Sequence, residues 1–171
     1  MTFGNFLVLV AGHDKEDQRE YAGVGFIIAH HIVPSIIGAT CYSNMIACLK
    51  LRVPGGNACI CSVYAPHNGH SLRVRQSFFA QLIRRYNSVS AHGPKLIYGD
   101  LNARIHHRLA GEDPIIGPFP FGDPLAIIGG SKNRQLLIEA CKALRLTVAN
   151  TWFDSSIEDQ VSFYAIGASP M

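Results

Sequence analysis

The sequence has few charged residues, a single tryptophan and no long apolar run. Asp, Glu, Lys and Arg make up only 16% of its 171 residues, while 48% of the residues are hydrophobic. This composition excludes the disordered class, which is rich in charge and poor in large apolar side chains. No apolar stretch reaches the length of a membrane span, so we expect no membrane partner. The length suits one domain with a real core, and we expect residues 1–171 to form a single domain.

No targeting signal is visible in the sequence either. The apolar stretch Phe6–Ala11 is short and has no basic region before it, unlike a signal peptide. Cysteines are few and odd in number: Cys41, Cys48, Cys59, Cys61 and Cys141. We interpret them as small buried side chains in a reducing compartment. A zinc site at Cys59 and Cys61 would need two further ligands at a recognisable spacing, and the sequence shows none.

The net charge of +3 does not by itself indicate a nucleic-acid partner. Basic residues do gather in two places, one in a predicted helix and one just after the stretch Gly99-Asp100-Leu101-Asn102. They are Arg73, Arg75, Arg84 and Arg85 in the helix, and Arg104, His106, His107 and Arg108 in the second cluster. We interpret the helix arginines as a solvated surface. The second cluster is equally compatible with a solvated surface and with phosphate contacts at a cleft.

Hydrophobic periodicity predicts a mixed α and β domain. Apolar or alternating runs predict strands at residues 6–10, 23–29, 46–53, 58–64, 96–98, 146–150 and 160–164. Helical spacing predicts helices at 71–89 and 133–144. The strand at 58–64 is apolar on both faces, which indicates a central position in a sheet. The segment 105–132 is rich in Gly and Pro, and a segment of that kind is usually a functional loop or an insertion.

The stretch Gly99-Asp100-Leu101-Asn102 follows a short apolar run and is the best candidate for a site. Gly99 permits a tight exit from the strand, and Asp100 and Asn102 would then lie at the mouth of the sheet. There a carboxylate can take a proton or hold a cation, and an amide can donate to an oxyanion. The alternative is a plain turn, because Gly-Asp and Asp-x-Asn are common turn sequences.

Five short motifs, taken in order, give the sequence a family likeness. They are Ala22–Phe26, Ser62–Pro66, Gly99–Arg104, Asn133–Leu137 and Asn150–Phe153. Each motif is weak alone, but their order resembles the endonuclease/exonuclease/phosphatase superfamily, and most closely the endonuclease domains of non-LTR (LINE-type) retrotransposons. This resemblance implies a DNase I-like four-layer α/β sandwich, in which two packed mixed sheets are flanked by helices.

The resemblance also implies roles for individual residues. Asp100 would be the base that orients or deprotonates the attacking water, and also a weak ligand of Mg²⁺, or of Mn²⁺ in its place. Asn102 would position Asp100 and donate to the phosphate, while Tyr64 would offer it a phenolic hydrogen bond. The residues implied to bind substrate are Asn133, Arg104 and Ser162. Read without the family, Tyr64 is a strand-end aromatic, Asn133 a helix N-cap and Ser162 a strand hydroxyl.

The resemblance further implies that the main glutamate ligand and an Asp-His pair lie outside this chain. We therefore expect an incomplete domain that acts on DNA in the nucleus, with doubtful activity and with self-association through uncovered sheet edges. The alternative is a non-catalytic remnant, at most a weak nucleic-acid-binding or interaction module.

Overall fold

The computed structural model describes residues 2–12, 23–122 and 132–156. The chain divides into two compact units, Met1–Asn102 and Ala103–Met171. The expectation of a single domain stays a prediction. No helix within the described ranges is both long enough and apolar enough to cross a bilayer.

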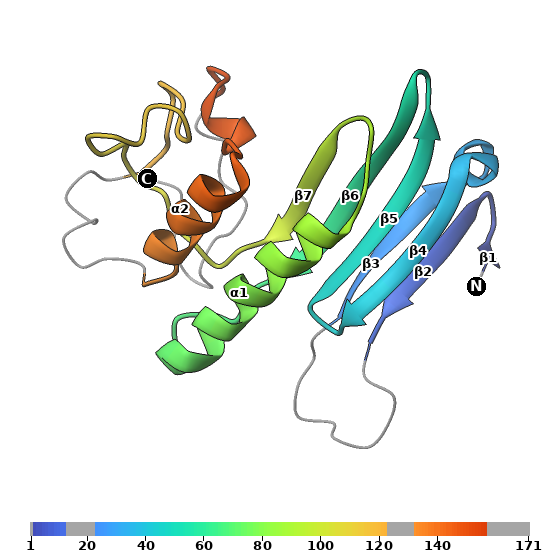
Figure 1. Ribbon diagram of the computed structural model, residues 1–171, viewed down its shortest axis with the longest axis horizontal. Helices are drawn as coiled ribbons and strands as arrows, with labels where there is room; N and C mark the ends of the chain where they lie inside the picture. Colours follow the sequence, from blue (N-terminus) through green and yellow to red (C-terminus); the bar gives the residue numbers. More distant parts are fainter. Residues whose placement is uncertain (1, 13–22, 123–131, 157–171) are drawn as a thin grey trace. The chain divides into compact units, whose positions relative to one another are not determined.

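The first unit contains two β-sheets (Figure 1). The first sheet has three antiparallel strands, β1 (Thr2–Phe3), β2 (Phe6–Ala11) and β3 (Val24–Ala29). A short 3-10 helix, η1 (His30–Ser35), leads into the second sheet. The second sheet has four strands in chain order, β4 (Ile36–Ser43), β5 (Ile46–Val53), β6 (Gly56–Tyr64) and β7 (Lys95–Asp100). The mixed α/β class predicted from periodicity is therefore confirmed.

The second sheet is mixed, because β4, β5 and β6 run antiparallel while β6 and β7 run parallel. The parallel pair is joined by the helix α1 (Leu72–Ser88), as a parallel connection requires. Ser71 is the N-cap of this helix, and its hydroxyl accepts a 3.4 Å hydrogen bond from the backbone N–H of Val74. As its apolar run predicts, β6 is central, between β5 and β7.

The second sheet is covered on both faces. On one face, β3 contacts β5 and β6, and Ala11, Val24 and Ala47 pack there beside Phe26. On the other face, α1 lies along the sheet (Figure 1), and Lys95 of β7 donates a 2.8 Å hydrogen bond to the carbonyl of Tyr86 in α1. The first unit therefore has three layers: sheet, sheet and helix.

The second unit contains the helix α2 (Lys132–Leu144) and the short 3-10 helix η3 (Ala149–Thr151). The strand predicted at residues 146–150 is wrong. Only Val148 forms a bridge there, to Ile116, and the chain then turns into η3. The hydroxyl of Thr151 stabilises that turn by donating to the carbonyl of Val148 at 2.6 Å and accepting from the N–H of Gly117 at 2.8 Å.

The structure also differs from the sequence predictions at β4 and at Arg75. The edge strand β4 was missed, because its stretch contains Gly38 and four small or polar residues with no clear alternation. The strand predicted at 160–164 lies outside the described residues. The reading of Arg75 as solvated is wrong: its side chain is 2% exposed, and its Nε donates to the carbonyl of His70 at 3.2 Å.

Candidate functional site

The carboxyl ends of β6 and β7 bring Tyr64 and Asp100 together. The two residues are direct partners in the parallel register. Beyond the strands, the N–H of Ala65 donates a 2.8 Å hydrogen bond to the carbonyl of Asp100. On the other side of β6, the N–H of Tyr64 donates to the carbonyl of Met45 at 3.0 Å. Both candidate residues are therefore held by backbone pairing at the edge where open α/β sheets collect ligands.

Asn102 fixes the turn that follows Asp100. Its backbone N–H donates a 2.7 Å hydrogen bond to Oδ1 of Asp100, which is the geometry of an Asx turn. Its side-chain amide donates a second bond of 2.7 Å to the carbonyl of Ala65. Asn102 has a left-handed backbone with φ of 46°, a conformation that asparagine tolerates better than most residues. The turn interpretation is thus correct as local geometry, and the same turn holds the carboxylate beside β6.

Gly99 is required by the approach of two backbones. Its φ is +139°, which L side chains rarely adopt, and a Cβ at this position would collide with the backbone carbonyl of Val63. The expectation that a side chain would clash at the strand exit is therefore confirmed. The close approach of β7 to β6 here is what sets Asp100 beside Tyr64.

The chemistry available at this edge is that of a carboxylate, a phenol and an amide in contact with water. Asp100 is exposed, and the Tyr64 side chain is 36% exposed. An exposed carboxylate can reach a water molecule or a hydrated cation, and a phenolic O–H can donate to an anion. Because magnesium often uses one or two carboxylates together with waters and substrate phosphates, the oxygen donors present fit that ion through a single carboxylate.

Two histidines follow β6 in a loop to which the sequence analysis gave no role. The rings of His67 and His70 are in contact in a tilted arrangement, with centroids 4.4 Å apart and an interplanar angle of 57°, and Nδ1 of His67 accepts a 3.0 Å hydrogen bond from the N–H of Gly69. His67 directly follows the second motif, Ser62–Pro66. Nothing in the sequence, however, indicated that His70 would pack against it.

The remaining predicted residues belong to the second unit. Arg104 is exposed. Asn133 is the second residue of α2, not its N-cap, and is 0% exposed. Ser162 lies outside the described residues. The structure therefore brings Tyr64, Asp100 and Asn102 together in the first unit, while the roles of the other three stay predictions.

Arg134 connects several segments of the second unit, and it was not among the site residues predicted from the sequence. Its guanidinium donates to both carboxylate oxygens of Glu112, at 2.8 and 2.5 Å, and both side chains are buried. It also donates to the carbonyls of Ile105 and His107, at 3.0 and 2.7 Å. Arg134 thus ties the loop after Ala103 to α2. Only its position beside Asn133 in the fourth motif could have drawn attention to it.

The pKa of Glu112 reflects this pairing. Burial raises the pKa of the carboxyl group, but the hydrogen bonds from Arg134 and from the N–H of Leu109, with the charge of Arg134, outweigh that effect. The pKa therefore lies below its ordinary value. Elsewhere in the unit, burial alone raises the pKa of the Cys141 thiol to about 11, so this thiol is protonated at neutral pH.

The interpretation of all five cysteines as buried thiols is wrong. Cys48 and Cys61 form a disulfide between β5 and β6, and Cys41 is exposed. The two half-cystines are direct partners in the antiparallel register, which the sequence alone could not reveal because it does not state the pairing of strands. Cys59 is a buried free thiol. Burial raises its pKa, and the charges of Lys95 and Lys50 lower it, with a net rise.

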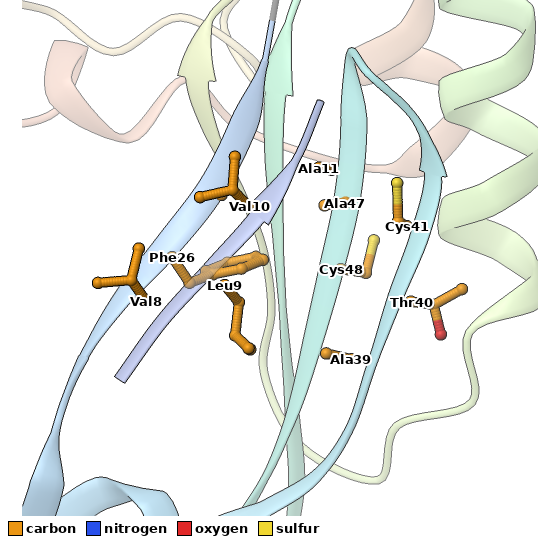
Figure 2. A pocket seen from close by; sticks show the side chains of 11 residues that line it. Val8, Leu9, Val10, Ala11, Phe26, Ala39, Thr40, Cys41, Ala47 and Cys48 are labelled. Carbon is orange, nitrogen blue, oxygen red and sulfur yellow. The ribbon is translucent and has the colours of Figure 1, made fainter. Parts of the chain in front are cut away.

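An open cavity of about 360 Å³ lies between the two sheets of the first unit. Figure 2 shows Leu9 and Phe26 from the first sheet on one side of it and Ala47 from the second sheet on the other. Its lining is apolar apart from Thr40 and cysteine, and it contains no carboxylate or histidine. It therefore lacks the groups that hydrolysis needs, and we place the candidate site at the ends of β6 and β7.

Comparison with known proteins adds nothing to this geometry. No protein-family model matches the chain, and no curated protein sequence matches it significantly, so the family likeness remains a resemblance carried by the five motifs.

Proposed function

We propose that the chain is a metal-dependent phosphodiesterase domain, a DNA-nicking endonuclease of retrotransposon type. The observation that carries the proposal is the meeting of Tyr64, Asp100 and Asn102 at the carboxyl ends of two parallel strands. Tyr64 lies 36 positions before Asp100 in the chain, and Asn102 follows Asp100 by two. The family resemblance assigns all three residues to one catalytic group.

Each residue has a chemical role that suits its position. Asp100 orients the attacking water and takes its proton, a role in which a carboxylate must reach water, as this one does. Asn102 holds the Asp100 carboxylate through its backbone N–H. The second hydrogen of its side-chain amide is a donor for a phosphate oxygen, since the first is directed to Ala65. Tyr64 donates its phenolic hydrogen bond to the phosphate.

Mg²⁺, or Mn²⁺ in its place, would be held by Asp100 together with waters and the substrate phosphate. When bound, such an ion neutralises charge on the phosphoryl oxygens and assists the leaving oxygen. The substrate would be DNA, with Arg104 and Ser162 contacting its backbone. Asn133 is 0% exposed and would join them only if its side chain were uncovered. A domain that nicks chromosomal DNA would act in the nucleus, and its full architecture would be the four-layer DNase I-like sandwich.

The test is nicking of supercoiled plasmid by the purified chain with magnesium. We expect EDTA-sensitive conversion to open circles, reduced about 100-fold or more by Asp100→Asn, because loss of a general base typically costs 10²- to 10⁴-fold. Tyr64→Phe removes only the phenolic hydrogen bond and should reduce the rate less. The matched control is Asp113→Asn, which removes an exposed carboxylate that forms a 3.5 Å ion pair with Arg108.

One observation favours the alternative, a non-catalytic remnant. At the candidate site, the described residues supply a single carboxylate. The group of possible metal ligands found among the described residues consists of cysteines, Cys48, Cys59 and Cys61. If wild type and Asp100→Asn nick plasmid at the same rate, the catalytic proposal is wrong. Fluorescence anisotropy with a labelled duplex would then show whether the chain still binds DNA in a salt-dependent way.

A further inference from the structure

Three cysteine side chains meet on the face of the second sheet that α1 covers. Cys48 on β5 lies directly opposite Cys61 on β6, with Cα atoms 4.1 Å apart. Cys59 precedes Cys61 by two residues, and their sulfur atoms are 3.9 Å apart. All three sulfurs lie within 4.8 Å of one another. Because residues two apart on a strand, and residues directly opposite on neighbouring strands, share a face, the backbone of two central strands sets this cluster.

A crosslink between β5 and β6 does not need the third cysteine. The disulfide joins Cys48 to Cys61 and leaves Cys59 as a free thiol that is 2% exposed. Its sulfur nevertheless remains in contact with that of Cys61. Reduction of the disulfide would therefore leave three thiols close to one another.

One of the sulfur–sulfur distances matches a three-coordinate thiolate site. A metal ion that binds sulfur at about 2.3 Å in a trigonal plane holds its sulfur ligands about 4 Å apart. The distance between the sulfurs of Cys59 and Cys61 is 3.9 Å. Thiolates select soft ions such as Cu(I), or zinc. Structural zinc takes four ligands, whereas the described residues place three cysteines here and no fourth Cys, His, Asp or Glu with them. The donor set therefore favours Cu(I) over zinc.

The charges around the cluster suit bound thiolates. Lys50 on β5 and Lys95 on β7 are the register partners of Cys59 on its two sides. Lys95 is kept on this face by its 2.8 Å hydrogen bond to the carbonyl of Tyr86 and by its position 4.5 Å from the centre of that ring. A Cu(I) ion with three thiolates carries excess negative charge, because each thiolate brings one negative charge and the ion only one positive charge. Two lysines offset that excess.

The cluster also has an approach from solvent. A cavity of about 310 Å³ lies between β4 and the residues that follow α1, and Cys48, Cys59 and Lys50 line it. An ion can therefore reach two of the three sulfurs without the sheet opening. Ligand identity, ligand number, spacing and an entry path are the features that a proposed metal site has to satisfy.

We propose that Cys48, Cys59 and Cys61 form a binding site for one Cu(I)-class thiophilic ion, available when the Cys48–Cys61 disulfide is reduced and closed when it forms. A dithiol reductant opens the site: it gives two electrons and two protons to the S–S bond, which becomes two thiols, and is itself oxidised to a disulfide. Binding of the ion then releases to solvent the proton of each thiol that becomes a ligand.

The test uses the full chain, reduced with dithiothreitol and exchanged into oxygen-free buffer. Cu(I) is titrated in competition with a coloured Cu(I) chelator, and luminescence from the Cu(I)–thiolate group is recorded in parallel. We expect one equivalent to bind. Oxidised protein, in which Cys41, Cys59 and Cys141 are the free thiols, should not bind at this site. A parallel zinc titration tests the class of ion.

Cys59→Ser is the decisive variant, because it leaves both half-cystines in place. Mutating a residue that only supports a metal ligand typically lowers metal affinity roughly 10- to 100-fold. Because Cys59 is itself a proposed ligand, we expect the Cu(I) affinity of Cys59→Ser to fall by at least that much. Cys41→Ser is the matched control, since it removes an exposed thiol outside the cluster, and it should bind like wild type. Circular dichroism and formation of the Cys48–Cys61 disulfide show whether a variant is folded. If Cys59→Ser does not fold, Cys59→Ala replaces it as the test variant.

Equal Cu(I) binding by wild type and a folded Cys59 variant would overturn the proposal, as would equal binding by the reduced and oxidised proteins. If the reduced protein binds zinc tightly and Cu(I) does not displace it, the proposed class of ion is wrong. These measurements do not involve plasmid nicking, so the outcome for this site is separate from that for the proposed nuclease.

Discussion

The side-chain amide of Asn102 donates a 2.7 Å hydrogen bond to the backbone carbonyl of Ala65, and so ties the residues that follow β7 and β6. Asn102 also has a left-handed backbone, with φ of 46°. The contribution of its side-chain amide to stability can therefore be separated from that of its backbone conformation. Asn102→Gly keeps the conformation and loses the amide, and should cost about 1 kcal/mol of unfolding free energy. Asn102→Ala should cost about 1 kcal/mol more, because a Cβ is disfavoured in the left-handed region. Urea denaturation measures both, and equal stabilities of the two variants would contradict this division.

Gly99→Ala should destabilise the first unit more than the same change at another glycine with positive φ. A Cβ at Gly99 meets the backbone carbonyl of Val63, whereas a Cβ at Gly55, with φ of +80°, meets nothing within 4 Å. Gly55→Ala should therefore show only the strain of its conformation, about 1 kcal/mol. Gly99→Ala should cost at least about 2 kcal/mol, since β7 must also move away from β6. Thermal unfolding of the two variants side by side decides whether the close approach matters.

Removing Arg134 should destabilise the second unit strongly. Arg134→Ala leaves the buried carboxylate of Glu112 without its partner, and breaking a buried pair in this way costs about 3–5 kcal/mol. The double variant Arg134→Met/Glu112→Leu removes both charges and should recover most of that loss. Chemical denaturation gives the comparison. A double variant no more stable than Arg134→Ala would show that the bonds from Arg134 to the carbonyls of Ile105 and His107 matter more than the pair.

Acid should weaken the second unit through Glu112. Because the pKa of this carboxyl group is lowered in the folded state, its ionised form stabilises the fold above its ordinary pKa of 4.5. That stability should be lost as the pH falls below 4.5 and through the folded-state value. Glu112→Gln should flatten the dependence of unfolding free energy on pH in this range. Glu139→Gln changes an exposed side chain that accepts from Gln135, and should leave the dependence as in wild type.

Self-association is expected to involve the outer face of the first sheet. Val10 and Ile27 on this face are 73% and 76% exposed, and β3 is an edge strand. Exposed apolar side chains beside an open edge promote pairing between copies. Ile27→Lys should therefore shift the chain toward monomer in size-exclusion chromatography with light scattering. Leu72→Lys, the same change at an exposed leucine of α1, should not. A wild-type chain that is monomeric at all concentrations would show that the edge does not pair.

The sequence by itself determined the elements with strong periodicity. The helices and the central position of β6 follow from local spacing and apolar content, which act within a few residues. The need for a glycine at position 99 was also readable, since a strand that ends at Gly-Asp requires a tight exit. Short irregular stretches were not readable in this way: β4 was missed, and residues 146–150 were assigned to a strand that is not there.

Only the tertiary structure decided which residues meet. The disulfide depends on Cys48 lying opposite Cys61, and a shift of one residue in the register would turn one of the two to the other face. Arg134 reaches Glu112 across 22 positions of the chain, and its charge is favourable in a buried place only because that partner is there. Strand pairing and burial are set by contacts between distant segments, so no local pattern in the sequence contains them.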